Sequence, residues 1–104
     1  MKYLKTYEGK HTKYKIGNYI VWNDEDIWEI CEIISKTNLN TIRVLDKFYL
    51  KDYNLNTHTS EFNTPSNIDL LSKEERDAIK YVSDDLEDCK ERIILMATAN
   101  KYNL

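Results

Sequence analysis

Glycine and proline are scarce in this 104-residue chain, which holds two glycines and one proline. No glycine-rich phosphate loop is present, because neither GxGxxG nor GxxxxGK[ST] occurs. The two histidines (His11 and His58) and the two cysteines (Cys31 and Cys89) form no close ligand pair of zinc-site spacing and stand beside no nucleophile motif. The sequence therefore predicts a protein that is not an enzyme and has no metal or cofactor.

Long apolar stretches are also missing, since the longest, residues 93–97, is far shorter than a membrane span. Residues 1–8 are basic but lack the apolar core and cleavage site of a signal peptide. Both cysteines fall in apolar stripes, as reduced buried thiols of cytosolic proteins do. We expect a cytoplasmic protein without membrane contact. Its richness in Lys, Asn, Ile and Tyr indicates AT-rich coding DNA of a phage, a mobile element or an AT-rich bacterium. If the chain is phage-encoded, its place would be the host cytoplasm.

Composition is that of an ordinary globular chain, with 41% hydrophobic residues, 32% charged residues and a net charge of −3. So mild a charge gives the chain as a whole no attraction for nucleic acid. The length suits one domain over residues 1–104. Within it we expect a tail at 1–12, a β-barrel at 13–71 and a helix at 72–100.

The densest β-branched and aromatic content lies in residues 15–22 and 27–35, on either side of a polar turn. This pattern predicts a first β-hairpin. The second strand changes its apolar parity between Ile30 and Ile33, which indicates a bulge or strong coiling of the kind that turns corners in small barrels. Residues 54–67 are polar and nearly free of charge, and fit either a mobile loop or a weakly marked hairpin around Phe62.

A helix is predicted from residue 73 to 99, opened by a capping box in which Ser72 and Glu75 exchange hydrogen bonds. It would be about 40 Å long, more than the width of a small barrel. Either it breaks at Ser83, or its distal half projects and packs on a second copy or another protein. The residues expected to pack or dimerise recur at steps of three and four: Ile79, Val82, Leu86, Ile93 and Met96.

Two acidic segments are candidates for docking on a partner with a basic surface, or else are solvated surface. Their carboxylates are Asp24, Glu25 and Asp26 in the turn, and Asp84, Asp85, Glu87 and Asp88 in the helix.

Aromatic residues form a second candidate surface, because so small a barrel has little room to bury all of them, although core packing explains most. Exposed aromatic rings on a barrel stack on bases or hold peptide side chains. The candidates are Tyr19, Trp22, Trp28, Tyr49 and Tyr53.

Residues 14–22, followed by Ile27-Trp28-Glu29-Ile30, resemble the start of small SH3-like β-barrel proteins, including short ones from phages and mobile elements. Those proteins open with a lysine-hydrophobic-glycine-polar-aromatic-hydrophobic strand and continue with a Trp-x-Ile strand. Residues 67–75 are similar to their last strand, which runs into a capped helix. The resemblance spans roughly residues 13–76. It implies a small SH3-like antiparallel β-barrel and leaves the ligand open, whereas the long final helix exceeds what such a barrel requires. Together they predict an α+β fold, a small SH3-like antiparallel β-barrel followed by a long C-terminal amphipathic helix.

We therefore expect a small non-catalytic protein-binding module whose partner has a basic surface, with homodimerisation through the C-terminal helix as a further expectation. If the chain is phage-encoded, it would inhibit a host defence or nucleic-acid-processing protein. The alternative is a nucleic-acid-binding module that uses the aromatic residues together with nearby lysines, namely Lys13, Lys15, Lys47 and Lys51.

Overall fold

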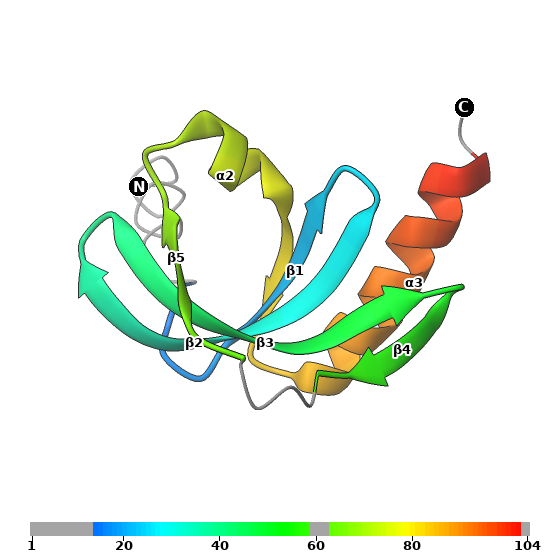
Figure 1. The fold of residues 1–104 in the computed structure, drawn as a ribbon, viewed down its shortest axis with the longest axis horizontal. Helices are drawn as coiled ribbons and strands as arrows, with labels where there is room; N and C mark the ends of the chain where they lie inside the picture. Colours follow the sequence, from blue (N-terminus) through cyan, green and yellow to red (C-terminus); the bar gives the residue numbers. More distant parts are fainter. Residues whose placement is uncertain (1–13, 59–62, 103–104) are drawn as a thin grey trace, which may run out of the picture.

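The computed structural model describes residues 14–58 and 63–102, with side chains up to residue 99. This part of the chain is an α+β fold of six strands and two helices (Figure 1). In chain order they are β1 (Tyr19–Asp24), β2 (Ile27–Asn38), β3 (Thr41–Lys51), β4 (Asn54–Thr57), β5 (Ser66–Asp69), α2 (Lys73–Ala78), β6 (Ile79–Ser83) and α3 (Leu86–Tyr102). The predicted tail at 1–12 and the predicted hairpin centre Phe62 lie outside the described residues.

The strands form one antiparallel sheet in the order β4-β3-β2-β1-β6, with β5 paired to β3 as well. The long strand β3 serves two partners, because β5 pairs with residues 41–44 and β4 with residues 48–51. The sheet is strongly coiled, and α2 lies across its concave side (Figure 1). Among the described residues no ladder joins β5 to β6, so the sheet is open.

Both faces of the sheet are buried, which explains the unbroken apolar run in β1. Ile20 pairs with Cys31 and belongs to a core on the concave face, the face toward α2. Val21 pairs with Ile30 and belongs to a second core, on the face covered by α3. The bulge predicted between Ile30 and Ile33 is wrong, because the β1–β2 register is regular there and the two residues lie on opposite, equally buried faces. The register shift beside Ile30 places its additional residue in β3.

The helix predicted over 72–100 is wrong, because strand β6 separates α2 from α3. β6 covers the edge of β1 and satisfies its backbone hydrogen-bonding groups. A register shift lets Ile79 pair with Trp22 while Val82 pairs with Ile20, so both residues pack on the concave core. A bulge in a strand thus produced the three-residue spacing that resembles a helix.

The break expected at Ser83 is where the polypeptide turns into α3. The Oγ atom of Ser83 accepts a hydrogen bond from the amide of Asp85 (3.0 Å), and Oδ1 of Asp85 accepts one from the amide of Glu87 (3.0 Å). From there Leu86, Cys89, Ile93 and Met96 pack on the sheet. The stripe expected to bind a second copy is therefore used within the chain.

The start of α2 follows half of the predicted capping box. The Ser72 hydroxyl accepts from the Glu75 amide (3.4 Å), as expected. The Ser72 amide, however, donates to the carbonyl of Asp69 and not to the Glu75 side chain. Glu75 instead lines a cleft on the concave side of the sheet.

Neither helix in the described part of the chain is both long and apolar enough to cross a membrane.

Residues 54–67, for which the sequence fits either a loop or a hairpin, include β4 and the start of β5. The β3–β4 hairpin turns through Asp52 and Tyr53, both at positive φ (53° and 62°), as in a type I′ turn.

Candidate functional site

A cleft of about 150 Å³ lies on the concave face, between the sheet and α2. Residues of four strands (β1, β2, β3 and β5) and of helix α2 line it. The lining residues are Trp22, Glu29, Cys31, Val44, Asp46, Ser66, Asn67, Ile68 and Glu75. Three carboxyl groups and one indole ring thus meet in a small, partly apolar hollow.

Strand register places the central side chains of this cleft. Trp22 pairs with Glu29 across β1 and β2, and Glu29 pairs with Tyr49 across β2 and β3. Because register partners project to the same face, these three residues form a row with the carboxylate between two aromatic rings. Cys31 lies two residues along β2 and pairs with Asp46 in the adjacent row.

Asp46 reaches the concave face by regular alternation from Val44, and a bulge in β3 then brings Tyr49 onto the same face. Ile30 pairs with Phe48, but Cys31 pairs with Asp46, so Lys47 is the additional residue. Lys47 instead forms an ion pair with Glu32 (3.5 Å). The Cys31 Sγ donates a hydrogen bond to Oδ1 of Asp46 (3.0 Å), which fixes this carboxylate beside Glu29.

Burial and the Asp46 carboxylate change the pKa values of two neighbouring groups, Glu29 and Cys31. Burial, the hydrogen bond to Asp46 and the charge of Asp46 raise the pKa of Glu29 to about 7. Burial, with the same carboxylate, raises the pKa of the Cys31 thiol far above its ordinary range. Cys31 therefore remains a protonated donor at neutral pH, while Glu29 is poised between its neutral and charged forms.

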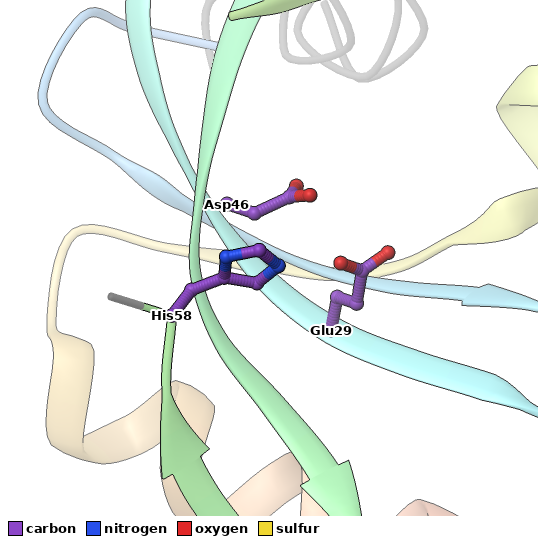
Figure 2. Close-up of side chains that lie close together, drawn as sticks. All are labelled: Glu29, Asp46 and His58. Atoms are coloured by element: carbon purple, nitrogen blue, oxygen red, sulfur yellow. The ribbon is translucent and has the colours of Figure 1, made fainter. Parts of the chain in front are cut away.

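His58, which follows directly after β4, lies beside Glu29 and Asp46. Its backbone N–H donates to the carbonyl of Lys47 (2.8 Å), and its ring meets that of Tyr49 edge-on, with 5.7 Å between centroids. The imidazole thus gathers with the carboxyl groups of Glu29 and Asp46 (Figure 2). One nitrogen or oxygen atom from each of the three lies within 4.8 Å of the others.

From the sequence, His58 has no ligand partner at zinc-site spacing, and neither Glu29 nor Asp46 is a predicted site residue. These residues are far apart in the chain and are joined by two ladders and a bulge, so no spacing links them. The available signal was Glu29 itself, a carboxylate that shares the inward parity of Cys31 in an apolar strand.

The acidic segments singled out from the sequence lie apart. Residues 24–26 are at the β1–β2 turn, whereas residues 84–88 begin α3 beside the opposite end of β1, where Tyr19 pairs with Ser83. Asp85 caps α3, and Asp88 accepts a hydrogen bond from the Tyr81 hydroxyl (2.6 Å). The structure therefore does not join the two segments into one acidic surface.

The five aromatic candidates are divided as well. Tyr19 and Trp28 pack in the core under α3, and Trp22 packs on the concave side. Tyr49 flanks Glu29, and Tyr53 is an exposed turn residue. Only Trp22 and Tyr49 belong to the concave site.

Comparison of this chain with protein-family models, curated proteins and solved structures gave no match.

Proposed function

We propose that this protein is a non-catalytic binding module whose concave cleft receives a lysine or arginine side chain of a protein partner. The observation that carries the proposal is the carboxylate of Glu29 held between Trp22 and Tyr49, with Asp46 alongside. An ammonium or guanidinium group inserted there would meet opposite charge and the face or edge of aromatic rings. Both interactions strengthen in a site that is partly removed from water.

The electrostatics of the empty cleft favour such a ligand. Two carboxyl groups that share a half-buried site repel each other when both are ionised, and a cation relieves that repulsion. Glu75 of α2 adds a third carboxylate to the wall. An anionic group of similar size would meet repulsion from all three.

The size of the cleft narrows the ligand class. A hollow of about 150 Å³ is below the usual volume of small-molecule sites, roughly 300–1,000 Å³, but holds one long side chain. We therefore propose that the cleft recognises a single basic residue of the partner, and that the rest of the partner's surface contacts the rim of the cleft. A partner with a basic surface, as expected from the sequence, fits this arrangement.

The nucleic-acid alternative receives less support from the described residues. The carboxylates beside Trp22 disfavour phosphate, and Lys47 is already paired with Glu32. That the partner is a host defence or nucleic-acid-processing protein stays a prediction. We also keep the SH3-like relationship as a proposal, supported by the coiled sheet in which β6 returns beside β1.

The experiment is an affinity capture with three matched baits from nuclease-treated lysate of the source organism, followed by calorimetry with each purified candidate. The baits are the wild type, a cleft variant (Glu29→Gln with Asp46→Asn) and a helix-start variant (Asp84→Asn with Glu87→Gln). The two variants remove the same number and types of charge. Their melting temperatures are compared to confirm that both fold.

We expect a partner whose affinity falls at least tenfold in the cleft variant and stays within twofold in the helix-start variant. If affinity falls in the helix-start variant and not in the cleft variant, the binding surface lies at the start of α3 and not in the cleft. If everything captured from untreated lysate is lost on nuclease treatment, the nucleic-acid alternative replaces the proposal.

A further inference from the structure

The cluster of Glu29, Asp46 and His58 has a second property that does not depend on a protein partner. It combines one imidazole nitrogen with carboxylate oxygens, and all three residues are half-buried. This donor set suits zinc and related first-row divalent ions, whereas calcium and magnesium prefer oxygen ligands alone. We infer that Glu29, Asp46 and His58 form a binding site for a divalent transition-metal ion.

The distances are close to those that an ion requires. Ligand atoms about 2.1 Å from a tetrahedral zinc lie about 3.4 Å from one another. The three donor atoms of the cluster lie within 4.8 Å of each other. Rotation of the longer Glu29 side chain is the adjustment that we expect on binding of an ion.

Neighbouring contacts hold two of the three ligands in place, as supporting hydrogen bonds do in metal sites. Asp46 accepts the hydrogen bond from Cys31 Sγ, and its backbone carbonyl accepts one from Nδ2 of Asn63 (2.8 Å). His58 is fixed by its backbone hydrogen bond to Lys47 and by the ring of Tyr49. Little further ordering is needed when an ion binds.

Three protein ligands leave a fourth coordination position. Because Glu29 and Asp46 both line the cleft, we expect this position to open toward the cleft. Water or an added donor would occupy it, as in zinc sites with three protein ligands. The site shares Glu29 and Asp46 with the proposed partner cleft, but binding of the ion requires no partner.

The test uses the untagged full chain, freed of metal with a chelator and titrated with zinc chloride by calorimetry. We expect one ion per chain, and a loss of affinity of roughly tenfold or more in His58→Ala and in Asp46→Asn. The matched control is His11→Ala, which removes the other histidine and should bind like the wild type. Titration with cobalt should give the absorption of nitrogen and oxygen ligands without a thiolate charge-transfer band.

Glu29→Gln provides a second variant of nearly unchanged shape, and melting curves without metal show that each variant folds. Absence of binding to the wild type at millimolar zinc would overturn the inference. Binding that survives in His58→Ala, or that is lost in His11→Ala, would overturn it as well. Because no partner is present, these outcomes leave the proposed protein-binding function to its own experiment.

Discussion

Glu29 in β2 and Asp46 in β3 place two carboxyl groups together on the half-buried concave face, and burial together with the neighbouring Asp46 raises the pKa of Glu29 to about 7. Neighbouring carboxylates that cannot both ionise freely are typical of sites that accept a proton or a cation. The described residues contain no ion pair from a lysine or arginine to either group. The pair is therefore available to an external cation.

Replacing Glu29 should change how stability depends on pH. Because the pKa of Glu29 is higher in the folded protein than its ordinary 4.5, the folded state binds more protons than the unfolded state between about pH 4.5 and 7. The free energy of unfolding should thus fall as pH rises through this window, by about 1–2 kcal/mol after allowance for partial exposure.

Glu29→Gln should abolish that fall and exceed the wild type in stability at pH 8, with little difference at pH 4. Urea unfolding with chelator present measures this. Parallel pH profiles for the two proteins would contradict the electrostatic account of the pair.

Zinc should weaken binding of a basic partner, since the ion and the cationic side chain use Glu29 and Asp46 in common. The apparent Kd of the partner should rise with zinc concentration and recover when EDTA is added. In His58→Ala, partner affinity without metal should be kept while the zinc effect is lost. An equal zinc effect in this variant would exclude competition at the cluster.

The exposed turn residue Tyr53 should be dispensable for binding. Its φ of 62° is unfavourable for a residue with a side chain, so Tyr53→Gly should stabilise the protein by about 0.5–1 kcal/mol. Thermal unfolding measures the gain, and affinity for a basic peptide should be unchanged. A loss of affinity would mean that the aromatic surface extends beyond Trp22 and Tyr49.

The packing of α3 on the sheet can be tested against self-association. Ile93 is fully buried, whereas Leu95 on the same helix is 64% exposed. Ile93→Ala should therefore cost about 2–4 kcal/mol in the free energy of unfolding, and Leu95→Ala less than about 0.5 kcal/mol. Sedimentation should give the mass of a monomer for both the wild type and Leu95→Ala. A dimer that dissociates in Leu95→Ala would show that the outer face of α3 is an interface.

Much of the sheet could be predicted from local pattern. The first hairpin and the polar turn at 23–26 follow from alternation, and the Ser72 cap follows from its own side chain. The change of parity between Ile30 and Ile33 does not mark a bulge, because apolar residues are buried on both faces of β2. β6 could not be predicted, because the bulge in β6 opposite Val21 and Trp22 makes Ile79 and Val82 recur with helical spacing.

The candidate site was missed for a related reason. Alternation from Val44 turns Asp46 inward, but only the bulge at Lys47 puts Tyr49 on the same face as Asp46. His58 then reaches the pair through the β3–β4 hairpin, which the sequence marks only weakly. Bulges and long-range register, which depend on the whole sheet, thus decide which side chains meet.

The most direct test of the binding proposal is an NMR titration of the metal-free protein with acetylated, amidated Gly-Lys-Gly and Gly-Arg-Gly, using the norleucine analogue as control. The proposal predicts saturable shifts at the Trp22 indole N–H and at the amides of Glu29 and Asp46. These shifts should be absent with norleucine and in the Glu29→Gln/Asp46→Asn variant. Shifts confined to residues 24–26 and 84–88, or equal shifts with norleucine, would contradict it.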